Sequence, residues 1–136
     1  MTQLEQWQQK YPQAPCWAFG DSPALADELV ALVIAGRKTA TCGSFTAFES
    51  DDARPYVGSY NILLNGRGEA AAVIRTVNMQ LIRFSAVTAE LARKEGEGDL
   101  SLDYWRNEHQ RFFTREGSFS PDMELVFEEF ILVECA

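Results

Sequence analysis

Residues 22–41 read SPALADELVALVIAGRKTAT, and they predict a capped helix that runs directly into extended chain. Ser22 is a preferred N-cap residue, and Pro23 suits the first helical position. Gly36 ends the helix in the manner of a C-cap glycine. The small, β-branched and aromatic residues over 39–48 then predict a strand or strand-like loop. The apolar residues that recur at helical spacing and form one face of this helix are Leu25, Leu29, Leu32 and Val33.

On either side of this stretch, predicted helices and hairpins alternate. Apolar spacing and turn residues predict helices around 4–11, over 85–94 and from Ser101 onward, and strands over 59–64, 69–82 and 123–133, with a hairpin turn at 65–68. Because the strands come in hairpins with helices between them, we expect an α+β fold. Its sheet should be mostly antiparallel or mixed and curled into a small barrel.

The composition indicates one globular domain in the cytoplasm. The chain has 136 residues, 46% of them hydrophobic, which is enough for one core and too short for two ordinary domains. No apolar run approaches the length of a membrane span, so no membrane association is expected. The start, MTQLEQWQQKYPQ, lacks the basic and apolar regions of an export signal. We therefore expect a cytoplasmic protein.

Charge and cysteine content narrow the class of partner. The net charge is −8, so the chain should repel a nucleic-acid backbone, and binding to duplex DNA is not expected. A single nucleoside, or a short single-stranded RNA in a local basic cleft, remains compatible with this charge. The three cysteines are odd in number and far apart, which fits reduced thiols. With one histidine in the chain, a structural zinc site is not expected.

Lys38 and Thr41 are the pair in the opening stretch that could carry chemistry. A threonine hydroxyl becomes a nucleophile only beside a base, and a lysine can be that base if burial or a neighbouring cation such as Arg37 lowers its pKa. In the alternative interpretation, both cations interact with the negative end of the helix dipole and the threonines fill strand positions. Spacing alone favours the alternative.

Two further segments carry candidate side chains. Residues 95–99 read EGEGD, which is either a solvated acidic loop or a source of a general acid/base, a hydrogen-bond acceptor or metal ligands. Composition alone favours the solvated loop. In the next helix, His109 shares a face with Trp105. A lone histidine there is typically partly buried and satisfied. With Arg106 and Arg111 nearby, the same helix could instead line a nucleotide site.

Taken in order, these elements resemble the ASCH-domain proteins, particularly the longer bacterial type. The motifs that carry the resemblance are GRKTAT at 36–41, Glu95 three residues after Ala92, EGEGD at 95–99, and Trp105-Arg106 followed by His109. It runs from about Phe19 to Val133. It therefore predicts a single domain over 1–136, with 1–18 as an N-terminal helical extension and 19–136 as the core.

The resemblance implies a barrel related to the PUA domain with a cleft for RNA or a nucleoside. Some small ASCH proteins are amidohydrolases of N4-acylated cytidine, which implies Lys38 as base, Thr41 as nucleophile and Glu95 as the acidic residue, with Glu97 as its alternative. No metal or organic cofactor is implied. The substrate-binding residues would be Arg37, Glu97, Trp105, Arg106 and His109. The alternative function is an RNA-binding module, with or without ribonuclease activity. A third is a binder of a modified nucleoside without turnover.

Overall fold

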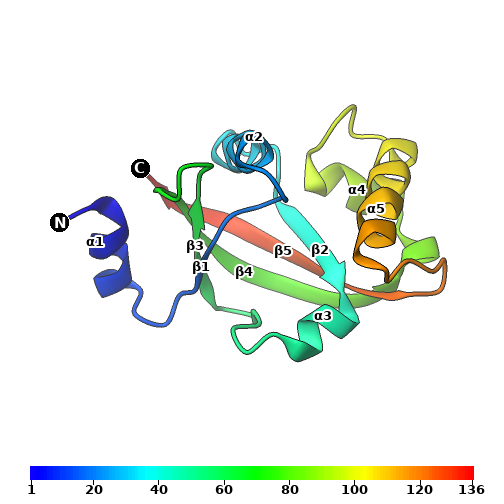
Figure 1. Ribbon diagram of the computed structural model, residues 1–136, viewed down its shortest axis with the longest axis horizontal. Coiled ribbons are helices and arrows are strands. Elements are labelled where there is room, and N and C mark those ends of the chain that lie inside the picture. Colours follow the sequence, from blue (N-terminus) through cyan, green and yellow to red (C-terminus); the bar gives the residue numbers. More distant parts are fainter.

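The computed structural model describes all 136 residues and arranges them around one five-stranded sheet (Figure 1). The strand order is β1-β3-β4-β5-β2, with β1 and β3 parallel and the other neighbouring pairs antiparallel. The elements are α1 (Gln3–Lys10), β1 (Cys16–Trp17), α2 (Pro23–Ile34), β2 (Ala40–Ser44), α3 (Phe45–Ser50), β3 (Tyr60–Leu64), β4 (Ala70–Arg83), a 3-10 turn (Phe84–Ala86), α4 (Ala89–Glu95), α5 (Leu102–Glu116) and β5 (Glu124–Cys135).

The expected α+β class with a mixed sheet is confirmed, although the sheet does not close on itself. The strands β1 and β2 are the two edges of the sheet and do not pair with each other. The edge strand β1 has only two residues, so it offers too short a ladder to close the sheet. No helix has both the length and the apolar character needed to cross a membrane.

The opening stretch folds as predicted except at its end. Ser22 caps α2 by accepting a hydrogen bond from the backbone N–H of Leu25, and Gly36 has a left-handed φ of 78°. The strand expected over 39–48 is only half right, because β2 ends at Ser44. The Ser44 hydroxyl accepts from the N–H of Ala47 and begins α3. The same preference of serine for N-caps that marked α2 thus also operates here.

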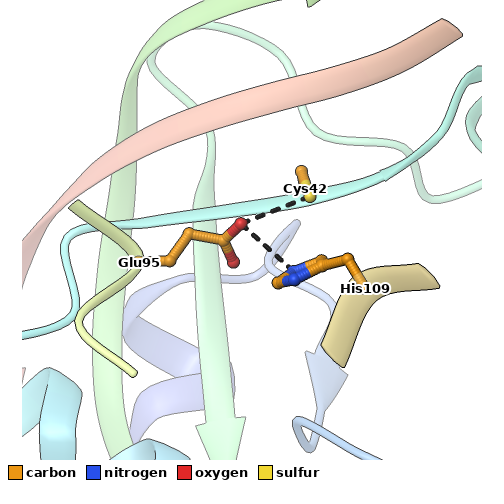
Figure 2. A group of neighbouring side chains, drawn as sticks. All are labelled: Cys42, Glu95 and His109. Atoms are coloured by element: carbon orange, nitrogen blue, oxygen red, sulfur yellow. Dashed lines mark hydrogen bonds and ion pairs between the residues drawn. The ribbon is translucent and has the colours of Figure 1, made fainter. Parts of the chain in front are cut away.

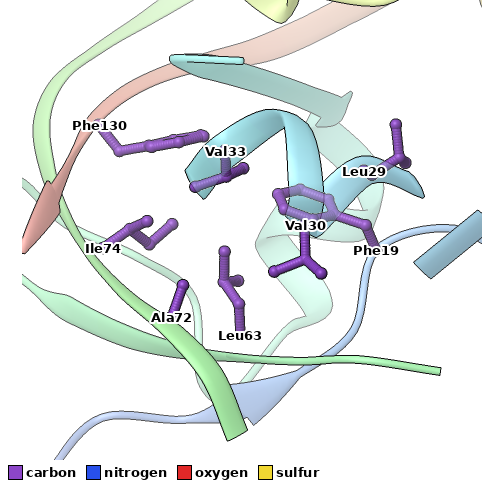
Figure 3. Close-up of a cluster of buried hydrophobic side chains, with 8 residues drawn as sticks. All are labelled: Phe19, Leu29, Val30, Val33, Leu63, Ala72, Ile74 and Phe130. Atoms are coloured by element: carbon purple, nitrogen blue, oxygen red, sulfur yellow. The ribbon is translucent and has the colours of Figure 1, made fainter. Parts of the chain in front are cut away.

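Two hydrophobic clusters form the core near the site. One packs α2 on the sheet (Figure 3) and consists of Phe19, Leu29, Val30, Val33, Leu63, Ala72, Ile74 and Phe130. The other lies under α4 and α5 and consists of Phe84, Val87, Ala92, Trp105, Phe113 and Leu125. Lys38, which follows α2, contacts the first cluster by placing its ammonium 5.2 Å from the Phe19 ring centroid. Glu95, the last residue of α4, lies beside the second, so the predicted site falls between the two clusters.

Candidate functional site

Lys38 is a buried cation with every proton engaged. The residue is 2% exposed, and its Nζ donates to the Glu95 carbonyl oxygen at 3.3 Å, to Glu95 Oε1 at 3.3 Å and to Glu97 Oε2 at 2.8 Å. An ammonium has three protons and no acceptor, so these three bonds saturate it. Burial lowers the pKa of Lys38, but the two carboxylates outweigh burial and raise the pKa above its usual value. The resting form is therefore the ammonium.

Glu95 is the centre of the cluster. It is 1% exposed, and its Oε2 accepts hydrogen bonds from the Trp105 indole N–H and from the Cys42 thiol, the latter at 3.3 Å. The same oxygen lies 3.3 Å from His109 Nε2 (Figure 2). Burial raises the pKa of this carboxyl, but Lys38 and His109 together lower it to about 2. Glu95 is therefore ionised at neutral pH.

The protonation of His109 follows from its two partners. Its Nδ1 lies 2.8 Å from the Trp105 carbonyl oxygen, which can only accept, so Nδ1 carries a proton. Nε2 faces the ionised Glu95, another acceptor, and needs a proton as well. Burial lowers the pKa of His109, and Glu95 more than offsets this and raises it. The ring also stacks on Trp105, with centroids 4.2 Å apart.

A glycine brings the two halves of this cluster together. Gly96 ends α4 with a left-handed φ of 71°. A Cβ at this position would lie 2.2 Å from the Arg37 carbonyl oxygen and 2.8 Å from the Lys38 Cα. The Thr39 N–H also donates to the Lys94 carbonyl oxygen at 2.7 Å. The backbone of 37–39 therefore packs directly on the end of α4, and only glycine allows this approach.

Thr41 lies outside the charge cluster. It is the second residue of β2, and no hydrogen bond joins its hydroxyl to Lys38. Its neighbour Cys42 contacts Glu95, and successive strand residues face opposite sides of a sheet. Thr41 is instead paired across the ladder with Glu128 of β5, and both line a hollow of about 210 Å³.

The remaining predicted residues divide into buried and exposed ones. Trp105 is 3% exposed, and its indole N–H donates a hydrogen bond to Glu95. Because the ring is covered by protein, it is not accessible for stacking on a base. Arg37 and Arg106 are exposed and form no ion pair with the cluster, whose members are Lys38, Cys42, Glu95, Glu97, Trp105 and His109. The structure thus unites five of the eight predicted residues and adds Cys42.

Cys42 has the wrong chemistry for a nucleophile in this state. Burial is the largest cause that raises the pKa of its thiol well above the usual value, and the adjacent Glu95 carboxylate raises it further. The thiolate, which is the reactive form, is therefore strongly disfavoured. The thiol acts as one more donor to Glu95.

Cys42, Glu95 and His109 are close enough to hold a metal ion, since their ligand atoms lie within 4.8 Å of one another. The charge around them opposes this use. Glu95 is already paired with Lys38, and a divalent cation would face that ammonium at close range. Metal binding would also require His109 to lose its Nε2 proton. The residues present therefore fit a hydrogen-bonded charge cluster better than a metal centre.

Sequence reasoning missed two buried polar residues, Asn61 and Glu128, of which Glu128 is the cross-strand partner of Thr41. The one available signal was the pair Glu128-Glu129 in the apolar middle of β5, where alternation must turn one of the two carboxylates inward.

The chain is similar to proteins that carry an ASCH domain. An ASCH domain model matches residues 15–134, and the chain belongs to the ASCH domain family. Protein EF3133 of Enterococcus faecalis V583, described as a member of family DUF984, is 34% identical, with a TM-score of 0.84 over 97% of this chain and 86% of its own. No match is found among curated proteins.

Two further solved structures are similar. An ASCH domain from Lactobacillus crispatus JV V101 is 28% identical, with a TM-score of 0.82 over 93% of this chain and 84% of its own. The hypothetical protein PH0355 is 13% identical, with a TM-score of 0.58 over 88% of this chain and 99% of its own, which supports the fold alone. With these neighbours, the expected PUA-like fold is confirmed.

Proposed function

We propose that this chain is a cytoplasmic amidohydrolase of N4-acylated cytidine or a related modified nucleoside, with Lys38, Thr41 and Glu95 as its catalytic set. The observation that carries the proposal is the buried ion pair between Lys38 and Glu95, next to the strand that holds Thr41. Family membership supports the same assignment, because the matched residues 15–134 include all three positions.

The cost of the cluster argues that it serves more than stability. Taking charges out of water is expensive, and apolar residues of similar size often replace a buried ion pair without loss of stability. This protein nevertheless buries Lys38 and Glu95 almost completely between two apolar clusters. Buried titratable groups with displaced pKa values concentrate at functional sites.

Glu97 provides a way to turn the resting ammonium into a base. It is the most exposed acid of the cluster, with 24% of its side chain accessible, and it lies between two glycines. A substrate that displaces Glu97 removes one of the two carboxylates that raise the pKa of Lys38. Burial, the largest single influence on the pKa of Lys38, then lowers that pKa and favours the neutral amine.

In the proposed reaction, neutral Lys38 takes the proton of the Thr41 hydroxyl as its oxygen attacks the acyl carbonyl carbon. The amide C–N bond breaks, and Lys38 returns the proton to the leaving N4 amine. Water then hydrolyses the threonine ester and releases the acid. Glu95 touches Lys38 throughout and holds the amine in place. Because Thr41 and Lys38 are not in contact in this structure, the reaction requires Lys38 to turn away from Glu97.

The test offers the purified protein N4-acetylcytidine and follows cytidine release by chromatography. Lys38→Met and Thr41→Val should each lower turnover by at least about 100-fold. Thr114→Val, an exposed threonine on α5, is the matched control and should keep full activity. Absence of turnover by the wild type would exclude N4-acetylcytidine as a substrate. Full activity of Thr41→Val would overturn the mechanism. Tight binding without product would identify the nucleoside binder that lacks turnover.

A second candidate function is binding of short single-stranded RNA. A hollow of about 560 Å³ on α5 is lined only by polar and basic residues, with Arg111 and Arg115 among them, and Arg106 is exposed on the same helix. Guanidinium groups in such a hollow suit phosphates. Affinity for a short single strand should then fall steeply with salt, and Arg111→Gln should reduce both affinity and salt dependence. Lack of binding at low salt would exclude this function.

A further inference from the structure

A cleft adjoins Thr41, and Cys42 is the one member of the charge cluster that lines it. It consists of two neighbouring hollows of about 210 and 290 Å³, which share Asp51, Pro55 and Glu128 in their walls. Thr41 lines the smaller hollow, and Asn61 lines the larger one. Together they approach the size of pockets that hold small ligands.

Asn61, which lines the larger hollow, has an unused buried donor. The residue is 3% exposed, and its Nδ2 is the one buried side-chain nitrogen or oxygen atom of the protein without a hydrogen-bond partner. Its orientation is determined, because the Trp17 indole N–H, which can only donate, bonds the Asn61 Oδ1 at 2.9 Å. A buried donor left without a partner is costly, so this N–H is a group that a ligand would satisfy.

Glu128 presents an acceptor in the same cleft. It is 7% exposed, and its Oε1 accepts from the Thr76 hydroxyl at 2.6 Å. Its Oε2 makes no hydrogen bond within the protein, and no cation pairs with this carboxyl. Burial raises the pKa of Glu128, whereas the pKa values of Glu95 and Glu129, which have a cationic partner, are lowered. A carboxyl buried without a cation is retained at a cost in stability.

A donor and an acceptor in one narrow cleft match the edge of cytosine. Cytosine offers its O2 as an acceptor and its N4–H as a donor, and a glutamate is a suitable acceptor for the N4–H. Flat rings are also available, since Trp17 lines the larger hollow and Phe48 the smaller one. Aromatic side chains bind bases by stacking on their faces.

We infer that this cleft is a nucleobase-binding site, in which Asn61 donates to the O2 of a cytosine ring and Glu128 accepts its N4–H. Glu128 is the cross-strand partner of Thr41, and such pairs have Cβ atoms about 5 Å apart. An acyl group on N4 therefore lies beside the Thr41 hydroxyl. This last step rests on the proposed function, whereas the binding of the base does not.

The experiment measures binding of cytidine and of uridine to the full chain by calorimetry or by NMR titration. The wild type should prefer cytidine by at least about tenfold, since uridine places its O4 acceptor against Glu128. Glu128→Gln turns the Oε2 acceptor into an N–H donor, keeps the bond from Thr76, and should reverse the preference toward uridine. Glu124→Gln, an exposed glutamate at the start of the same strand, is the control and should leave both affinities unchanged.

The outcomes separate this inference from the proposed function. Cytidine binding that depends on Glu128, without cytidine release from the acylated nucleoside, supports the site and overturns the hydrolase. Turnover that Glu128→Gln leaves unchanged supports the hydrolase and overturns the site. Equal affinity of the wild type for cytidine and uridine also overturns it. Asn61→Ala gives a second reading, since loss of the donor to O2 should weaken both nucleosides about equally, while unchanged affinities would contradict its role.

Discussion

Replacing Glu95 with glutamine tests whether the charge cluster has the electrostatics described above. In the wild type, one carboxylate oxygen accepts from Lys38 and the other accepts from three donors. Glutamine has nearly the same shape, but it offers one oxygen and one NH₂ group. Wherever the oxygen points, the NH₂ group faces a donor, and the cations Lys38 and His109 have one carboxylate fewer.

The size of the effect follows from the pKa of Glu95. Its fall from the ordinary 4.5 to about 2 corresponds to roughly 3 kcal/mol of stabilisation of the charged form. Removal of one partner from a buried ion pair is typically destabilising by about 3–5 kcal/mol. We therefore expect Glu95→Gln to lower the free energy of unfolding at pH 7 by about 3–5 kcal/mol.

Urea unfolding followed by tryptophan fluorescence measures this change. Glu49→Gln is the matched control, because Glu49 is exposed and its side chain makes no hydrogen bond or ion pair; it should change stability by less than about 0.5 kcal/mol. The double variant Lys38→Met/Glu95→Gln removes one of the cations and the donor that conflicts with the glutamine. It should be less destabilised than the sum of the single variants by at least about 1 kcal/mol.

Two results would refute the reasoning. A loss below about 1 kcal/mol in Glu95→Gln would mean that the carboxylate is not held by its cations. Strict additivity in the double variant would mean that Lys38 and Glu95 do not interact energetically.

Three further predictions concern pH, backbone and thiol chemistry. The pKa of Glu95 is lower in the folded than in the unfolded protein, so Glu95 stabilises the fold fully above about pH 4.5 and loses this effect as pH falls toward 2. A pH series of unfolding curves should show this loss in the wild type and little of it in Glu95→Gln. Gly96→Ala should destabilise the protein by more than about 2 kcal/mol, since the new Cβ would collide with backbone. Gly117→Ala is the control, because it has a similar φ of 80° and its Cβ meets open space; it should cost only about 1 kcal/mol. Equal losses in thermal unfolding would contradict the close approach at Gly96. A thiol reagent should modify exposed Cys135 quickly and Cys42 only on unfolding, and rapid labelling of Cys42 in mass spectrometry would show that its thiol is not held by Glu95.

The parts of the fold that were predicted are those with a long periodic signal. The helix α2 repeats its apolar face over three turns, and β4 is long enough to be recognised despite two register shifts against β5. The short elements were missed. The strand β1 has two residues and exists only because it pairs with β3, and α3 has six residues in a stretch whose composition suits a strand. Closure of the sheet likewise depends on how its edges meet, which local pattern does not encode.

The candidate site divides in the same way. Lys38, Glu95 and Glu97 stand in recognisable motifs, and their order along the chain was enough to select them. Both carboxylates reach Lys38 only because Gly96 packs against the backbone of 37–38. Lys38 and Glu95 are 57 residues apart in the sequence, so local pattern does not reveal this contact. Asn61 and Glu128 lie in strands, and their burial depends on residues that are distant in the sequence.

The close approach at Gly96 also divides the EGEGD segment into two parts with different freedom to vary. Everything up to Gly96 is anchored to the backbone of 37–39, so the spacing between Lys38 and Glu95 is set by main chain against main chain. Beyond this anchor, Glu97 still bonds Lys38 at 2.8 Å, whereas Gly98 and Asp99 are exposed and make no contact with the buried pair. Sequence changes at Asp99 therefore leave the charges around Lys38 in place, while changes up to Glu97 alter them.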